Sequence, residues 1–539
     1  MGRARSTLLL AGTVVGLVLG TVPSAAGPPA GPAAPDPAAA AAEADLARAR
    51  AAIGTDLDSA TIPVLQQRMR DGRLSSVTLT LAYLARIRVV DRKVNAVLEV
   101  NPVALAEAAA SDVHRRTRGA RGPLEGIPVL LKDNVNTRVQ PATAGSRALA
   151  RARADRDADL VRRLHAAGAV VIGKANLSEW ANFRSTNSTS GWSAVGGLTN
   201  NPYVLDRNPC GSSSGSGAGV AASLAQVAIG TETDGSIVCP SGQNGVVGIK
   251  PTLGLVSRTG VVPLSLQQDT AGPMARHVVD AALTLAVLQG VDPADPATRE
   301  IPATQPRDYT AGLTADGLRG KRIGVFRKAG RSPEADVVVQ RAVEAAQRAG
   351  ATVIEVELPY QDEADAAEFP ALLSEFKADI NAYLAATPGR HPRDLAGLIE
   401  FNENDPVELR YFGQEIFLQA QSAPDDASEA RATATGLQRR AIDETLAAHR
   451  LDAIMAPTNS PAWRSTLGEG DAFVLGSSSP AAVSGYPNIT VPAGFAGELP
   501  VGVSFFGSRW NEAGLIGIAY AFEQQTHARR APRYLPTIG

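Results

Sequence analysis

Residues 159–173, DLVRRLHAAGAVVIG, combine a short amphipathic helix with a strand. Apolar and charged residues alternate with helical spacing from Asp159 to Ala167, and Gly168 ends the pattern. The continuous apolar run AVVIG that follows is typical of a strand buried on both faces. The stretch therefore predicts a helix that leads directly into a strand of a covered sheet.

A second unit of the same kind lies further along the chain. KRIGVF (321–326) predicts a strand, Ser332-Pro333 begins a helix, Gly350 ends it, and ATVIEVEL (351–358) predicts the next strand. Strands that alternate with helices indicate an α/β sheet with helices on both faces. Residues 363–450 are instead almost entirely helical in pattern, which predicts a helical insertion on the sheet.

Composition restricts the classes of partner. The 539 residues are 44% hydrophobic, with 52 basic and 54 acidic residues and a net charge of -2, so a large core is expected. Basic and acidic residues are mixed, and no basic stripe for nucleic acid is present. We expect a small molecule or a peptide as partner, and no nucleic acid.

The N-terminus resembles a secretory signal peptide. Arg3 and Arg5 precede an apolar stretch from about Leu8 to Val22, and small residues around Ala26 mark a cleavage site. We expect a signal peptide at 1–26, a Pro/Ala-rich linker at 27–41 and the folded domain at 42–539. The mature protein is then secreted and not membrane-bound, although an uncleaved membrane anchor is the alternative.

Cysteine and histidine usage does not indicate a metal or other cofactor. The two cysteines, Cys210 and Cys239, are either paired or two buried free thiols. The six histidines are scattered singly, and no metal-binding motif occurs. No cofactor is therefore expected.

Two serine motifs suggest hydrolases of different families. Gly211 to Gly215, GSSSG, matches the nucleophile elbow G-x-S-x-G with Ser213 as nucleophile. The residues before it, however, predict turns where the elbow needs a strand, and a flexible Ser/Gly loop is the alternative. Ser374-x-x-Lys377 matches S-x-x-K, but it lies in an amphipathic helix and no K-T-G follows.

Two other stretches carry groups that can do chemistry. In GIPVLLKDNVN (126–136), Lys132 ends an apolar strand, where it either reaches solvent or is a desolvated base with a lowered pKa. In VAIGTETDGSIVCPSG (227–242), an apolar strand breaks at Gly230 and resumes with Ile237. A loop of this kind can direct several backbone N–H groups at one point beside Ser236, as an oxyanion hole requires.

The lysine, the Gly-Ser-Ser cluster and the G-T-x-x-x-G-S-I-x-x-P segment together resemble the amidase signature family. Further matches extend over nearly all of residues 60–530: AGSRAL at 144, GKANLSEWANF at 173, GIKPTLGLVSR at 248, DTAGPMAR at 269, DAIMAPT at 452, YPNITVPAGF at 486 and LPVGVSFFG at 499. GTETDGSIVCP, together with Trp180 and Trp192, is most similar to the peptide amidase branch.

The resemblance implies a fold and a set of site residues. The fold is a single α/β/α domain around a mixed sheet covered by helices. The catalytic residues implied are Ser236 as nucleophile, Ser212 preceded by a cis peptide bond, and Lys132, so that Ser213 is not the nucleophile. The oxyanion hole is formed by the backbone N–H groups of Thr233, Asp234, Gly235 and Ser236. The expected substrate contacts are Trp180, Trp192, Asp234 and Val238.

The implied activity is hydrolysis of neutral carboxamides through an acyl-enzyme, with C-terminal peptide amides as the expected substrates. Many relatives that accept acidic substrates carry Arg shortly after the nucleophile, where this chain has Val238 and Cys239. Alternatives are an esterase or aryl-acylamidase with the same three residues, an amidotransferase subunit, and a non-catalytic binding protein on the same fold. The sequence leaves the oligomeric state open.

Overall fold

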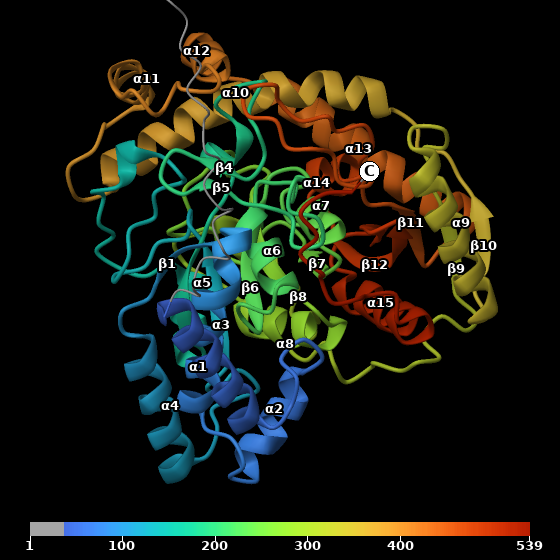
Figure 1. The fold of residues 1–539 in the computed structure, drawn as a ribbon. Helices are drawn as coiled ribbons and strands as arrows, with labels where there is room; N and C mark the ends of the chain where they lie inside the picture. The colour runs from blue at the N-terminus through green and yellow to red at the C-terminus, as the bar shows by residue number, and fades with distance from the viewer. Residues whose placement is uncertain (1–36, 539) are drawn as a thin grey trace, which may run out of the picture.

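A mixed, eleven-stranded β-sheet forms the centre of the computed structural model, which describes residues 37–538 (Figure 1). The strands in their order across the sheet are β1 (Val97–Val100), β3 (Val170–Ala175), β2 (Pro128–Lys132), β6 (Val227–Glu232), β8 (Thr270–Ala275), β7 (Val247–Lys250), β12 (Asn488–Ala496), β13 (Leu499–Phe506), β11 (Ala453–Pro457), β9 (Arg322–Val325) and β10 (Thr352–Glu355).

Parallel pairing is confined to the two flanks of the sheet. On one flank β2 pairs in parallel with β3 and β6, and on the other β9 pairs in parallel with β11 and β10. The strands between them pair antiparallel. Both predicted helix and strand units are confirmed, since α5 (Asp159–Ala166) leads into β3 and α9 (Pro333–Arg348) joins β9 to β10.

Helices surround the central sheet (Figure 1). The N-terminal helices are α1 (Pro37–Ile53), α2 (Ile62–Arg70), α3 (Ser76–Val94) and α4 (Ala104–Arg118). Besides α5 and α9, the helices that follow or lie between the later strands are α6 (Ser214–Ala221), α7 (Val238–Gln243), α8 (Val278–Leu288), α14 (Ser479–Ser484) and α15 (Glu512–Thr526). The predicted α/β/α architecture is therefore confirmed.

The expected helical insertion is present and lies along one side of the molecule, at the top in Figure 1. It consists of α10 (Gln361–Ala386), α11 (Leu395–Asn404), α12 (Glu415–Ser422) and α13 (Ser428–His449). Helix α10 packs against α13 and α12. Short elements complete the chain: the 3-10 helices η1 (Arg147–Leu149), η2 (Glu179–Asn182) and η3 (Pro296–Glu300), and the small ribbon of β4 (Trp192–Ser193) and β5 (Gly197–Leu198).

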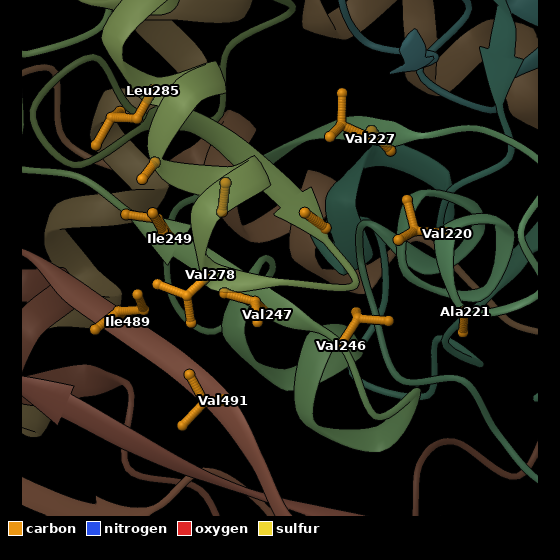
Figure 2. Packing of buried hydrophobic residues seen from close by; sticks show 14 of the residues in the cluster. Val220, Ala221, Val227, Val246, Val247, Ile249, Val278, Leu285, Ile489 and Val491 are labelled. Atoms are coloured by element: carbon orange, nitrogen blue, oxygen red, sulfur yellow. The ribbon is translucent and has the colours of Figure 1, made fainter. Parts of the chain in front are cut away.

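Aliphatic side chains from the central strands and from the helices beside them form the main core. Figure 2 shows Val247 and Ile249 of β7 near Ile489 and Val491 of β12, with Val278 of α8 alongside, and all are buried in one cluster. Burying one such side chain contributes about 1.5–3 kcal/mol to folding. This core holds the strand ends from which the site residues emerge.

Two boundaries differ from the prediction. Helix α1 begins at Pro37, so the last residues of the predicted linker 27–41 are helical, because alanine favours helix and proline is tolerated in its first turn. The second difference is in the segment of Ser236: β6 continues to Glu232, past the predicted break at Gly230, and Ile237 leads into α7 where the sequence predicts a resumed strand. The expected signal peptide lies outside the described residues. Within residues 37–538, no helix is long and apolar enough to cross a membrane.

Candidate active site

Lys132 is the last residue of β2, and its side chain lies in the interior of the protein. Every residue of β2 is buried, and the Lys132 side chain is fully inaccessible to solvent. Its Nζ lies 2.8 Å from Ser212 Oγ, 2.9 Å from Thr231 Oγ1 and 3.1 Å from the Thr231 carbonyl oxygen. Lys132 therefore does not reach solvent, and of the two alternatives its burial favours the desolvated base.

Burial lowers the pKa of Lys132 to about 7, although the carboxylates of Asp269 and Glu232 act in the opposite direction. A neutral amine has two N–H bonds and one lone pair. If the two oxygens of Thr231 accept the two N–H groups, the lone pair is left facing Ser212 Oγ. The environment of Lys132 thus suits a base that takes a proton from a serine.

Ser212 stands between the lysine and a second serine. The Gly211–Ser212 peptide bond is cis, and the Ser212 side chain is fully buried. Ser212 Oγ lies 3.0 Å from Ser236 Oγ, within hydrogen-bond distance. No side chain fits at Gly211, because a Cβ there would lie 2.1 Å from Ser178 Oγ. The hydroxyl of Ser212 can therefore pass a proton between Ser236 and Lys132.

Ser236 is the member of this set that a substrate can reach. It lies in the loop between β6 and α7 and is 8% exposed, whereas Lys132 and Ser212 are both 0% exposed. A nucleophile must contact the substrate, while its base and relay need not. The exposure therefore matches Ser236 to the nucleophile and the other two groups to the relay.

Glu232 organises the backbone on either side of Ser236. Its Oε2 accepts hydrogen bonds from Ile237 N at 2.7 Å and Val238 N at 3.0 Å. These two bonds hold the backbone at the start of α7, where the sequence predicts a strand. The backbone N–H groups just before them, those of residues 233–236, donate to no acceptor within the described part of the chain. They belong to Thr233, Asp234, Gly235 and Ser236. These four donors are available to a developing oxyanion beside Ser236 Oγ.

Ser213 makes different contacts. Its Oγ donates to the Thr231 carbonyl at 3.0 Å and accepts from Thr231 N at 3.2 Å. The side chain is fully buried, and no strand leads into the turn that precedes it. Ser213 thus ties the start of α6 to β6, and the structure lacks the strand that a nucleophile elbow needs.

A disulfide joins the two serine segments. Cys210 and Cys239 are bonded, with their Cα atoms 6.0 Å apart, and this settles the choice between paired and free thiols. Cys210 lies two residues before Ser212, and Cys239 lies three residues after Ser236. The bond therefore fastens the loop of one hydroxyl to the helix that follows the other.

The expected substrate contacts are not all brought together. Trp180 lines a small cavity with Thr231, Thr233 and Leu264, next to the lysine. Trp192 does not line this cavity, because its ring packs edge-on against aromatic rings of the helical insertion, Tyr411 at 5.5 Å and Phe412 at 5.1 Å.

The other two expected contacts flank the nucleophile. Val238, the first residue of α7, is 1% exposed, and its side chain does not line the Trp180 cavity either. Asp234 lies two residues before Ser236 and is half-buried, and burial raises the pKa of its carboxyl. Burial therefore disfavours the charged form of the carboxyl two residues from Ser236.

Several residues of the site were not predicted from the sequence. Thr231 binds Lys132, and Asn134 Nδ2 donates to Thr231 Oγ1 at 2.9 Å. Asp269 accepts from Thr233 Oγ1 at 2.5 Å and from the N–H groups of Leu264 and Ser265, and burial raises its pKa to about 6. The only signal in the sequence is position, since Thr231 and Asn134 lie within the two motifs that carry Lys132 and Ser236.

Comparisons with known proteins agree with this geometry. Residues 78–516 match the family model described as amidase. The solved structure of a native peptide amidase from Stenotrophomonas maltophilia is 51% identical, with a TM-score of 0.83, over 88% of this chain and 99% of that chain.

Two curated relatives are more distant in sequence. A protein of Arabidopsis thaliana described as a probable amidase is 41% identical over 89% of this chain and 92% of its own length. A glutamyl-tRNA(Gln) amidotransferase subunit of Chloroflexus aggregans is 36% identical over 88% of this chain and 99% of its own length.

Proposed function

Since the chain belongs to the amidase signature family and is an amide-hydrolysing enzyme, we propose that Ser236, Ser212 and Lys132 hydrolyse the C-terminal amides of peptides. The products are the peptide acid and ammonia. The observation that carries the proposal is the continuous path from Ser236 Oγ through Ser212 Oγ to Lys132 Nζ, with steps of 3.0 and 2.8 Å.

Acylation begins when Ser236 Oγ attacks the carbonyl carbon of the amide. The Ser236 proton moves to Ser212 Oγ as the Ser212 proton moves to neutral Lys132. The N–H groups of residues 233–236 stabilise the oxyanion of the tetrahedral intermediate. As the C–N bond breaks, the ammonium of Lys132 returns its proton through Ser212 to the departing nitrogen, and ammonia leaves.

Deacylation uses the same path with water in place of the serine. Water attacks the Ser236 ester, its proton passes through Ser212 to Lys132, and the tetrahedral intermediate collapses to release the acid. The proton then returns from Lys132 to Ser236 Oγ. The enzyme is restored without a metal or another cofactor entering the balance.

Preference for a neutral substrate is supported by the charges near the nucleophile. Many relatives that accept acidic substrates carry Arg shortly after the nucleophile, whereas this chain has Val238 and Cys239 there. The arginine that lines the Trp180 cavity, Arg258, is paired with both oxygens of Asp295, at 2.5 and 2.6 Å, so its charge is compensated. A buried carboxylate of a substrate would remain unpaired there, at a cost of several kcal/mol.

Transfer of ammonia to aminoacyl-tRNA is the second candidate, because the chain is 36% identical to the glutamyl-tRNA(Gln) amidotransferase subunit of Chloroflexus aggregans. Identity to the peptide amidase is higher, and the signal-peptide pattern of the N-terminus does not suit work on tRNA inside the cell. These two observations favour the peptide amide.

We also propose that the protein is secreted. The N-terminal pattern of basic residues, apolar stretch and small residues supports export, and a disulfide is typical of oxidising compartments. The mature N-terminus of protein collected from the medium should lie near residue 27, and full-length protein retained in the membrane fraction would contradict this.

A panel of substrates tests the proposed activity. Purified protein is given N-acyl peptide amides, short aliphatic amides, anilides and the matching esters, and ammonia or acid release is followed for each. We expect kcat/KM to be highest for the N-acyl peptide amides. Turnover of esters or anilides with no hydrolysis of any peptide amide would assign the protein to the esterase or aryl-acylamidase alternative.

A further inference from the structure

Gln268 lies beside the loop that carries the proposed oxyanion donors. It precedes β8, which pairs antiparallel with β6 so that Thr270 stands opposite Glu232. The same register, continued by two residues, brings Gln268 next to the loop after β6. The side chain of Gln268 is 1% exposed, and its Nε2 donates to the Thr233 carbonyl oxygen at 2.9 Å.

This hydrogen bond fixes the direction of a neighbouring N–H group. The Thr233 carbonyl and the Asp234 N–H belong to one trans peptide unit, and in a planar trans peptide they point in opposite directions. A donor that holds the Thr233 carbonyl therefore also sets where the Asp234 N–H points. That N–H is one of the four that find no acceptor among residues 37–538.

The amide of Gln268 is itself held in one orientation. Arg431 Nη1 lies 2.6 Å from Gln268 Oε1, and because arginine only donates, the oxygen of the amide must face it. The nitrogen then faces the Thr233 carbonyl and Glu368 Oε1, which accepts at 2.6 Å. Both polar atoms of the Gln268 amide are thus engaged.

Arg431 is itself fixed by an ion pair within the helical insertion. Its Nε and Nη2 bind the two oxygens of Glu375 at 2.7 and 2.6 Å, and Glu375 also accepts from Ser265 Oγ at 2.6 Å. Arg431 lies on α13, and Glu368 and Glu375 lie on α10. Two helices of the insertion therefore reach the loop after β6 through Gln268.

We infer that Gln268 is a positioning residue for amide hydrolysis, which holds the peptide between Thr233 and Asp234 so that the Asp234 N–H is directed at the oxyanion. The inference rests on the proposed function, since the oxyanion forms there only if Ser236 is the nucleophile. A donor directed at the oxyanion stabilises the transition state more than the bound substrate. Its loss should therefore lower kcat and leave KM almost unchanged.

Two variants remove the hydrogen bond in different ways. Gln268→Met keeps the length of the side chain without its amide, and Gln268→Glu keeps an acceptor for Arg431 but, when ionised, has no donor for Thr233. Each is compared with Gln267→Met, a change at the exposed neighbour of Gln268, as the matched control. The readouts are kcat and KM on a peptide amide, and the Ki values of a peptide aldehyde and of its alcohol. The aldehyde forms a tetrahedral adduct with a serine, whereas the alcohol only occupies the site.

Both Gln268 variants should lose roughly 10- to 100-fold in kcat, somewhat less than removal of an oxyanion donor costs. The Ki of the aldehyde should rise by a similar factor, with KM and the Ki of the alcohol nearly unchanged. Gln267→Met should match the wild type. Unchanged kcat in the two Gln268 variants, or an equal loss of affinity for aldehyde and alcohol, would overturn the inference.

Two further variants keep the test decisive. If Gln268→Met does not fold, Arg431→Met takes its place, because it leaves the Gln268 amide free to rotate by 180°. It should show the same pattern with a smaller loss of kcat. Wild-type kinetics in this variant would overturn the inference. Ser236→Ala is measured in parallel. If Ser236→Ala is active, the proposed function fails, whereas inactive Ser236→Ala together with unaffected Gln268 variants means that only the positioning role fails.

Discussion

Lys132 Nζ and Ser212 Oγ lie 2.8 Å apart in a part of the protein that solvent does not reach. A charged ammonium is disfavoured in such surroundings, which is why the pKa of Lys132 falls to about 7. The serine is thus in contact with an amine that loses its proton near neutral pH.

Alanine at any of the three positions should abolish most of the activity. Ser236→Ala, Ser212→Ala and Lys132→Ala each interrupt the proton path, so kcat should fall by roughly 10⁴-fold or more. Because the residues act as one relay, a double variant should be scarcely worse than the worst single one. Steady-state kinetics measure the loss, and circular dichroism shows whether the fold is kept.

Ser213→Ala is the matched control for these variants. It removes a hydroxyl one residue from Ser212 that bonds only the backbone of Thr231. We expect a loss of stability of about 1 kcal/mol and nearly normal kcat. An inactive Ser213→Ala beside an active Ser236→Ala would contradict the assignment.

The rate should rise with pH through about 7 and level off above it. Below the pKa of Lys132 the amine is protonated and cannot accept the proton of Ser212, so the active fraction falls as pH falls. A profile of kcat/KM between pH 5 and 9, on a substrate that does not titrate in this range, measures the midpoint. A rate that is constant over the whole range would show that Lys132 is not the base.

The sequence predicts those residues of the site that lie within a local motif. Lys132, Ser212 and Ser236 each lie in a motif that the sequence displays, so their roles can be predicted from it. Gln268 and Arg431 meet only because α13 packs over the loop before β8, and no local pattern contains that contact. Such residues require the fold.

The boundary that the sequence predicts wrongly after Ser236 has a similar cause. Ile237 begins an apolar run that suits a strand, but the Glu232 carboxylate binds the first two N–H groups of the run and starts a helix. The substrate contact expected of Trp192 stays a prediction, and the packing of its ring could not be predicted. Its neighbours, Tyr411 and Phe412, come from the helical insertion more than 200 residues away, which the sequence cannot place beside it.

Opening the Cys210–Cys239 bond should weaken both the fold and the catalysis. The bond closes a loop between residues 29 apart in sequence and fastens the segments of Ser212 and Ser236 to each other. The double variant Cys210→Ala/Cys239→Ala should be about 3 kcal/mol less stable and should have a lower kcat. Denaturant unfolding and kinetics measure the two effects, and wild-type values for both would refute the proposed role of the bond.

Charge next to the scissile amide should decide between otherwise matched substrates. An N-acyl peptide amide should have a kcat/KM at least about 100-fold above that of a substrate with a free carboxylate beside the scissile bond, because that carboxylate finds no partner and lies near Asp234. Asp234→Asn should narrow the difference. Equal rates for the two substrates would show that another cation binds the carboxylate.

The acyl-enzyme itself provides the most direct test of the central claim that Ser236 is the nucleophile. An N-acyl peptide ester is mixed with the protein, the reaction is quenched in acid within its first turnovers, and the modified residue is located by peptide mapping with mass spectrometry. We predict a single adduct with the mass of the acyl group on Ser236, which is absent from Ser236→Ala. An adduct on Ser213 or Ser212, with Ser236 unmodified, would contradict the account.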